Sequence, residues 1–259
     1  MCVRLDIHGT ADVIGVQADN PGWLTLDGTN TWIVGTGDVW VVDPGPELSD
    51  HVAAVFEAVT QRGALAGIAL THGHGDHADA VPLLLELSGL VPIISGLSGA
   101  AAGDHAGEME VIALPGHSAD HLAFAFGDIV FTGDAIFADS SVFVAPGPGS
   151  MAGYLKGLQG LIDRTPRVLA PGHGPLVHPP AERLQEQIDH RLDRERRLIE
   201  AIASGHTSID AMLETVWDDV PEMLLPAATV TLAAHLDKLE EEERLPADVE
   251  RPDIPEWVV

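Results

Sequence analysis

Cysteine is almost absent from this 259-residue sequence, because Cys2 is the only one. A single cysteine excludes an intramolecular disulfide and argues against a metal site built on thiolates. Any bound metal ion must then be held by imidazole and carboxylate groups.

Long apolar runs are also missing. The richest stretch, Val81 to Ile94, contains Glu86 and two prolines, and no run reaches the roughly 18 residues that a membrane-spanning helix needs. The first ten residues carry Arg4, Asp6 and His8 where a secretion signal would need an apolar block. We therefore expect no membrane segment and a cytoplasmic location.

Basic residues are scarce, with 13 against 40 acidic ones and a formal net charge of -27. A field of this sign repels polyanions, which disfavours an extended nucleic-acid groove. From Ala181 to the end there are 20 acidic and 8 basic residues. A DNA-binding module usually has an excess of basic residues, so this charge balance argues against one. We expect no DNA partner and a small-molecule substrate.

Strand and helix patterns alternate up to Pro179-Pro180, and only helical patterns follow. This change predicts an α/β catalytic domain over residues 1–178 and a small helical domain with a tail over residues 179–259. The strands are expected at Val39–Val42, Ile68–Leu70, Val91–Ile94, Met109–Ala113, His121–Phe126, Ile129–Thr132 and Arg167–Ala170. The helices are expected around Val52–Val59, Asp76–Leu87, Met151–Ile162, Ala181–Ala203, Ile209–Val216 and Ala227–Glu243.

The segment Thr71–His77 places three imidazoles and one carboxylate within six positions: His72, His74, Asp76 and His77. In extended chain, residues two apart point to the same side, so His72 and His74 can converge on one ion. Asp76 and His77, at the turn into a helix, then face a neighbouring position. The intervening glycines let the backbone pass close to an ion.

Three further ligand-type residues each directly follow a glycine at the end of a predicted strand. They are His117 in Pro-Gly-His, Asp134 in Thr-Gly-Asp and His173 in Pro-Gly-His. Imidazole and carboxylate suit zinc, iron or manganese, and a carboxylate can bridge two ions where an imidazole cannot.

As a set, these motifs resemble the metallo-β-lactamase superfamily over roughly residues 10 to 178. The runs Gly28–Trp32 and Val42–Gly45, with the helical C-terminal unit, are most similar to the branch of β-lactamase-like protein 2 and glyoxalase II. The resemblance implies a four-layer αββα sandwich followed by a small winged-helix-like domain. It also implies that His72, His74 and His117 hold the first metal, that Asp76, His77 and His173 hold the second, and that Asp134 bridges them.

Two divalent ions about 3.5 to 4 Å apart, expected to be zinc with iron or manganese as alternatives, can share a water and lower its pKa towards neutrality. The bridging hydroxide attacks the substrate and the ions stabilise the oxyanion, so no serine or cysteine nucleophile is needed. Asp76 is given a second role in proton handling. We expect Asp43 and His121 to orient the ligand imidazoles.

Asp134 argues against an antibiotic-degrading lactamase, because by the resemblance those enzymes lack the bridging carboxylate. His74 argues against the flavodiiron oxidoreductases, whose pattern has glutamate there. Hydrolysis of a thioester or lactone remains the preferred activity, with an endoribonuclease or phosphodiesterase as the alternative, so RNA stays open as a substrate. Trp23 and Phe143 are predicted to line the substrate site. The C-terminal domain is expected to wall the cleft or to support a homodimer.

Overall fold

The computed structural model describes residues 3–254, and its chain divides into two compact units. The first unit comprises the chain up to Ala113 together with Asp120–Ser140 and Pro166–Pro180. The second unit comprises Leu114–Ala119, Ser141–Thr165 and the chain from Ala181 onward.

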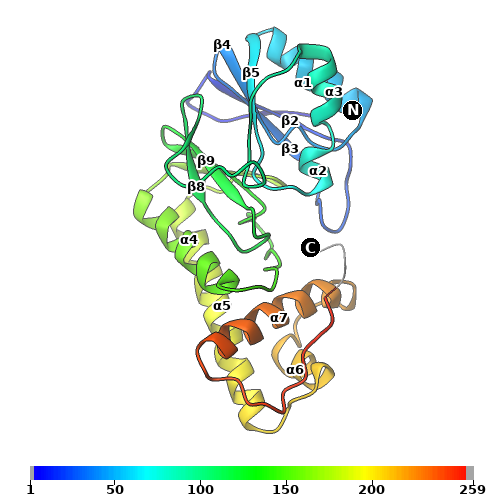
Figure 1. Ribbon diagram of the computed structural model, residues 1–259, viewed down its shortest axis with the longest axis vertical. Helices are drawn as coiled ribbons and strands as arrows, with labels where there is room; N and C mark the ends of the chain where they lie inside the picture. The colour runs from blue at the N-terminus through cyan, green and yellow to red at the C-terminus, as the bar shows by residue number, and fades with distance from the viewer. Residues whose placement is uncertain (1–2, 255–259) are drawn as a thin grey trace. The chain divides into compact units, whose positions relative to one another are not determined.

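The first unit contains two mixed sheets (Figure 1). Within residues 3–254, one sheet has six strands in the order β1-β2-β3-β4-β5-β6, antiparallel from β1 to β4 and parallel from β4 to β6. These strands are β1 (Val3–Asp6), β2 (Val13–Gln17), β3 (Asn30–Val34), β4 (Gly37–Val42), β5 (Gly63–Ala69) and β6 (Ile93–Ile94).

The other sheet has five strands within the described residues, in the order β11-β10-β9-β8-β7. All neighbours are antiparallel except β10 and β11. The strands are β7 (His105–Ala106), β8 (Met109–Ala113), β9 (Leu122–Phe126), β10 (Ile129–Gly133) and β11 (Val168–Pro171). The strand predictions are confirmed to within a few residues at their ends, while β1, β2, β3 and β7 carry no strand prediction.

Alternating side chains give the first sheet two buried faces. Trp32 and Val34 of β3 pack in one apolar cluster with Phe124 and Phe131 of the second sheet. Ile33, which points the other way, packs in a separate cluster with the apolar residues of α1 (Ser49–Thr60) and α3 (Val81–Ser88). The first sheet is therefore covered by the second sheet on one face and by α1 and α3 on the other (Figure 1).

The single helix predicted over Asp76–Leu87 is wrong, because two helices occupy this segment. They are α2 (Gly75–Ala78) and α3, which begins at Val81 with a proline in its first turn. Pro82 lacks a backbone N–H, and in a continuous helix its ring would clash with the carbonyl of Ala78. The break lets α2 carry Asp76 and His77 independently of α3.

The second unit is helical. It contains α4 (Ser150–Arg164), α5 (Pro180–Ala203), α6 (Ile209–Val216), the 3₁₀ helix η1 (Glu222–Leu224) and α7 (Leu225–Glu241). Leu198 of α5, Met212 of α6 and Leu232 of α7 share an apolar core, which Val249 beyond α7 joins. The helices predicted in this part of the chain are confirmed with ends shifted by one or two residues.

Glu195 of α5 is a charged residue buried in this unit. Its carboxylate lies 2.9 Å from the ammonium of Lys238 on α7. Burial would raise its pKa, but the contacts with His235 and Lys238 outweigh that effect and lower the pKa to about 2. The pair therefore ties α5 to α7 while Glu195 is ionised.

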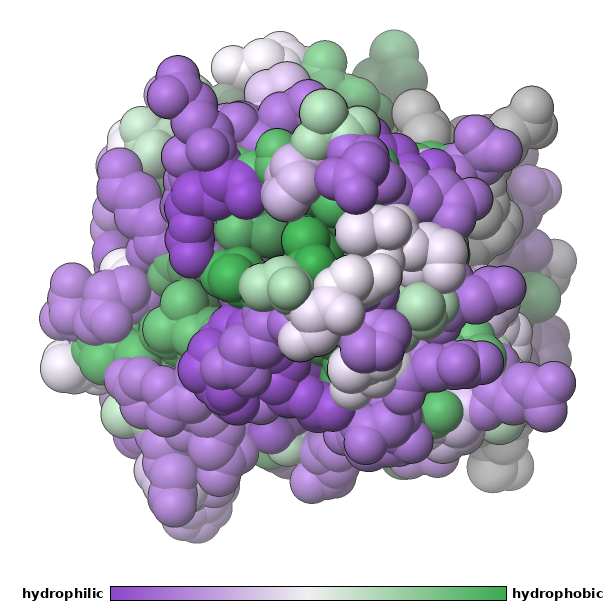
Figure 2. Space-filling model, turned by 90° about the horizontal axis from the view of Figure 1, so that it is seen from below, coloured by the Kyte–Doolittle hydropathy of each residue, from purple (hydrophilic) through white to green (hydrophobic). Residues whose placement is uncertain are grey.

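The surface carries many hydrophilic residues. Figure 2 shows one face that is mainly hydrophilic, with hydrophobic residues gathered in an area that hydrophilic ones surround. Among the described residues, no helix is both long enough and apolar enough to cross a membrane.

At pH 7, Glu195→Gln should lower the free energy of unfolding by about 1.5 to 3 kcal/mol, the range for a hydrogen bond to a charged group. Because the folded-state pKa lies near 2, below the ordinary 4.5, this stabilisation is present above pH 4.5 and is lost as the pH falls towards 2. Urea unfolding of both proteins at stepped pH measures the difference.

Glu200→Gln serves as the control, because Glu200 pairs with Arg196 on the exposed face of the same helix. Its effect should stay below about 1 kcal/mol. A Glu195 variant as stable as wild type at pH 7, or a difference that grows in acid, would contradict the prediction.

Candidate metal centre

The histidine-rich loop follows the end of β5 and runs into α2. His72 and His77 are fully buried, and His74 is partly buried. The Nε2 atom of His72 lies 3.0 Å from Nδ1 of His74. The loop leaves β5, which has hydrogen-bonded neighbours on both sides, β4 and β6.

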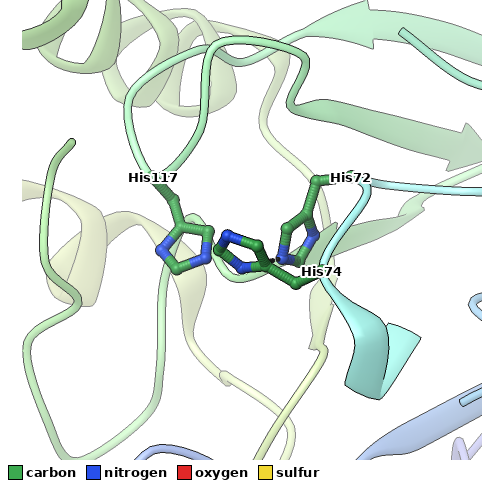
Figure 3. Close-up of side chains that lie close together, drawn as sticks. All are labelled: His72, His74 and His117. Atoms are coloured by element: carbon green, nitrogen blue, oxygen red, sulfur yellow. Dashed lines mark hydrogen bonds between the residues drawn. The ribbon is translucent and has the colours of Figure 1, made fainter. Parts of the chain in front are cut away.

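The first group of converging side chains is His72, His74 and His117. Each offers a ring nitrogen, and these nitrogens lie within 4.8 Å of one another. Figure 3 shows the three rings close together, with His72 and His74 coming from the same loop. Three imidazoles in this arrangement are a suitable ligand set for a divalent transition metal.

A second group consists of Asp76, His77 and His173, with one ligand atom of each again within 4.8 Å of the others. His173 follows the end of β11, and its Nε2 atom lies 3.3 Å from Nε2 of His77 and 3.2 Å from Oδ2 of Asp76. This group joins the end of β11 to α2, almost a hundred positions apart in the sequence.

Asp134, directly after β10, contacts both histidines of the second group. Its Oδ1 atom lies 3.4 Å from Nε2 of His77, and its Oδ2 atom lies 3.4 Å from Nε2 of His173. Asp134 also forms a converging group with His72 and His77. Its carboxylate is therefore shared between the two sets of imidazoles.

Gly172 is required by the close approach of these side chains. A Cβ atom at this position would lie 2.5 Å from Oδ1 of Asp134 and 2.5 Å from Cε1 of His77. Any larger residue before His173 would push the carboxylate or the imidazole aside.

Asp43, directly after β4, holds the histidine-rich loop through hydrogen bonds. Its Oδ1 atom accepts a hydrogen bond from the backbone N–H of Thr71 at 2.7 Å. Its Oδ2 atom accepts one from the Thr71 hydroxyl at 2.7 Å and lies 2.9 Å from Nδ1 of His77. This leaves Nε2 of His77 turned towards His173 and Asp134.

His121 contacts the cluster differently. Its Nε2 atom accepts a hydrogen bond from the backbone N–H of Asp134 at 3.2 Å, and its ring stacks on His72 at a centroid distance of 5.0 Å. These contacts constrain the backbone that carries the shared carboxylate.

The two predicted substrate residues lie in different surroundings. Trp23 is 47% exposed, in the loop between β2 and β3. Phe143 is buried in an apolar cluster with Ala145 and Val230, and its ring lies 4.4 Å from that of His117. Sequence reasoning gave no role to Leu97 and Asp120, which lie beside Gly73 and carry no motif that could have indicated them.

The electrostatics of the cluster favour a positive charge. Burial alone would raise the pKa of Asp134, but His173 and His77 outweigh it and hold that pKa well below the ordinary range. Burial would lower the pKa of His173, but Asp134 and Asp76 raise it to about 9. The nitrogens that attract a proton here would attract a metal cation for the same reason.

The sequence matches two family models. The model of the metallo-beta-lactamase superfamily matches residues 24–110 and 88–173, and that of the beta-lactamase associated winged helix domain matches residues 208–248. The first model therefore covers every residue of the metal cluster.

Among curated proteins, the chain is 27% identical over 267 residues to the beta-lactamase-like protein 2 homolog of Drosophila melanogaster, covering 91% of this chain and 90% of that protein. It is also 28% identical over 238 residues to the atrochrysone carboxyl ACP thioesterase of Aspergillus chevalieri, covering 82% of this chain and 75% of that one.

Two solved structures illustrate the likeness of fold. A beta-lactamase domain protein from Burkholderia ambifaria superposes with a TM-score of 0.77 at 17% identity, over 92% of this chain and 88% of that one. The protein TTHA1623, solved in a di-iron-bound form, is 28% identical with a TM-score of 0.50, over 61% of this chain and 91% of that one.

These matches confirm the expected four-layer αββα fold and the C-terminal winged-helix domain. They also agree with the branch of β-lactamase-like protein 2 that the Gly28–Trp32 run indicated. The chain is therefore a hydrolase of the metallo-β-lactamase superfamily.

Proposed function

We propose that the cluster holds two divalent metal ions and that the enzyme hydrolyses a small thioester or lactone. His72, His74 and His117 would hold the first ion, and Asp76, His77 and His173 the second. Asp134 would bridge the two. Zinc is the preferred metal, with iron and manganese as alternatives that accept the same ligands.

The observation that carries the metal proposal is the 3.3 Å approach of the His77 and His173 Nε2 atoms. Two imidazole lone pairs that face each other at this distance repel, unless a proton or a metal ion lies between or beside them. The carboxylate oxygens of Asp76 and Asp134 within 3.7 Å complete a donor set of nitrogen and oxygen atoms. The di-iron form of the similar TTHA1623 supports a paired centre on this fold.

When bound, a pair of divalent ions supplies an activated water at neutral pH and stabilises the oxyanion that develops on an attacked carbonyl. The residues of this chain set the geometry around that chemistry. Asp43 fixes the ring orientation of His77 through Nδ1, and His121 fixes the backbone of Asp134. Asp76 is the most exposed carboxylate of the cluster, with 29% of its side chain accessible, which suits a role in moving a proton to or from solvent.

Apolar side chains beside the metal loops favour an ester-type substrate with an apolar part. Leu97 is 74% exposed, yet a Cβ placed on Gly73 would lie only 2.9 Å from its Cδ1 atom, so it borders the histidine-rich loop. Leu26 lies on the loop that carries Trp23. A Cβ placed on Gly174, the residue after His173, would lie 3.1 Å from the Cδ1 atom of Leu26.

The thioesterase among the relatives acts on a substrate of this type by its name, which supports the same class here. The net charge of -27 opposes binding of a long polyanion, so RNA is the less favoured substrate. We further propose a cytoplasmic location and leave the homodimer as an expectation.

Purified protein should contain close to two metal equivalents by elemental analysis, the number that the proposed ligand sets would hold. Asp134→Ala should lower both the metal content and the turnover, because the bridging carboxylate is lost. Asp128→Ala, which removes an exposed carboxylate paired with Arg167, is the matched control and should change neither. A fully loaded Asp134→Ala protein would contradict the assignment.

A panel of thioesters, lactones, bis(p-nitrophenyl) phosphate and short RNA should show the highest kcat/KM with a thioester or lactone. Cleavage of RNA alone, abolished by His117→Ala, would overturn the preference for small substrates and establish the nuclease alternative.

Trp23→Ala and Leu97→Ala should each raise KM for substrates with long apolar acyl groups more than for acetyl substrates. The expected loss is about 1.5 to 3 kcal/mol of binding for full burial of such a side chain, which corresponds to about ten- to a hundredfold in KM. Leu90→Ala, at a leucine that is 92% exposed, is the control and should have no effect. Unchanged kinetics of Trp23→Ala on every substrate would remove Trp23 from the site.

A further inference from the structure

The segment Thr29–Thr31, where β3 begins, makes contacts that the proposed chemistry does not use. Asn30 is fully buried, and its side-chain Nδ2 donates to the carbonyl oxygens of Pro171 at 3.1 Å and Gly174 at 2.9 Å. Its backbone N–H donates to the carbonyl of Gly172 at 2.7 Å. One asparagine thus holds three carbonyls of the loop that carries His173.

The orientation of this amide is fixed from the other side. Gln17 of β2 donates through Nε2 to Oδ1 of Asn30 at 3.1 Å, which leaves both Nδ2 hydrogens for the loop. Thr29 forms an isolated antiparallel bridge with His173 itself. Hydrogen bonds from β3 therefore satisfy the carbonyls of Pro171, Gly172 and Gly174 around His173.

The neighbouring residue, Thr31, contacts Asp43, the residue that holds His77, the other histidine of the second group. Its hydroxyl donates to the backbone carbonyl of Asp43 at 2.6 Å and lies 2.9 Å from Nε2 of His51. His51 is 1% exposed and belongs to α1.

Such support matters for Asp43, because its φ of +51° lies in the left-handed region, which costs energy for a residue with a side chain, although aspartate and asparagine adopt it more often than most residues. In this conformation its carboxylate reaches both Thr71 and Nδ1 of His77. Loss of the Thr31 hydroxyl would leave the strained backbone of Asp43 held by fewer bonds, and His77 would lose its fixed orientation.

Adjacent residues of one strand thus act on the two histidines of one group: Asn30 fixes the backbone on both sides of His173, and Thr31 contacts Asp43, which in turn holds His77. We propose that Asn30 and Thr31 are positioning residues that set the separation of His77 and His173 and thereby the affinity of the second metal ion. This inference rests on the proposed paired metal centre. Thr31 also reaches the first group indirectly, because Asp43 binds the hydroxyl of Thr71, which lies 3.0 Å from Nδ1 of His72. Both substitutions should therefore act mainly on the second ion, and Thr31→Val should also weaken the first ion to a smaller extent.

The test uses the full-length protein, stripped of metal and titrated with zinc chloride against a chromophoric chelator. Thr31→Val and Asn30→Asp keep the side-chain shape and remove the donated hydrogen bonds. Each should weaken binding of the second zinc ion by about ten- to a hundredfold, the usual effect of losing a partner of a metal ligand. The first ion should bind as in wild type in Asn30→Asp and should be weakened less than the second ion in Thr31→Val. Thr31→Ser keeps the hydroxyl and should restore the second affinity.

Val55→Ala, in the apolar layer between α1 and the first sheet, controls for a general loss of stability. It should lower stability but leave both zinc affinities unchanged. Hydrogen exchange of the metal-free proteins gives a second measurement, in which peptides covering Val168–Val177 should exchange faster in Asn30→Asp than in wild type or in Val55→Ala.

The outcomes separate this inference from the proposed function. If wild type binds two zinc ions and the Thr31→Val and Asn30→Asp proteins bind both as tightly, the positioning role is overturned. Equal weakening of both ions, matched by Val55→Ala, would also overturn it, because that result reflects stability alone. If wild type binds fewer than two ions, the paired centre fails and the metal role of β3 fails with it, while the exchange data still report whether Asn30 holds the loop.

Discussion

The structure depends on keeping two buried imidazole nitrogens face to face. Nε2 of His77 and Nε2 of His173 are 3.3 Å apart, and the nearby oxygens of Asp134 make their surroundings strongly negative. In the metal-free protein this arrangement depends on protons, because Asp134 and Asp76 raise the pKa of His173 to about 9, and His173 and His77 hold the pKa of Asp134 well below its ordinary range. The fold must still hold the side chains in place, and the paired cations that we propose would take the place of these protons.

The sheets provide that restraint by ending several strands at one place. Strands β4, β5, β10 and β11 each run from an apolar core into a loop whose first residues include a member of the cluster or, in the case of Asp43 after β4, a residue that holds one in place. The rigid strands fix where each loop starts, and the loops are short enough that hydrogen bonds from β3 and from Asp43 can fix the rest. Glycine at position 172 removes the one side chain that would keep His77 and Asp134 apart.

Much of this was predictable from the sequence. The ligand-type residues each follow an apolar strand pattern, and the glycines beside them marked them as candidates, while spacing alone indicated only that His72 and His74 can converge. The convergence of all seven on one centre was implied by the resemblance to the superfamily. The break at Pro82 could also have been predicted, since proline cannot continue a helix that begins before it. The roles of Asn30, Thr31 and His51 could not, because their partners are mainly backbone carbonyls of loops distant in sequence, and a backbone carbonyl leaves no residue-specific signal. Leu97 was missed for a related reason, since a lone leucine in a loop carries no periodicity.

The most direct test of the paired centre is anomalous X-ray diffraction from crystals grown with zinc, recorded on both sides of the zinc absorption edge. Two peaks about 3.5 to 4 Å apart are predicted, one beside His72, His74 and His117 and the other beside Asp76, His77 and His173, with Asp134 between them. A single peak, or none within bonding distance of His173, would contradict the account.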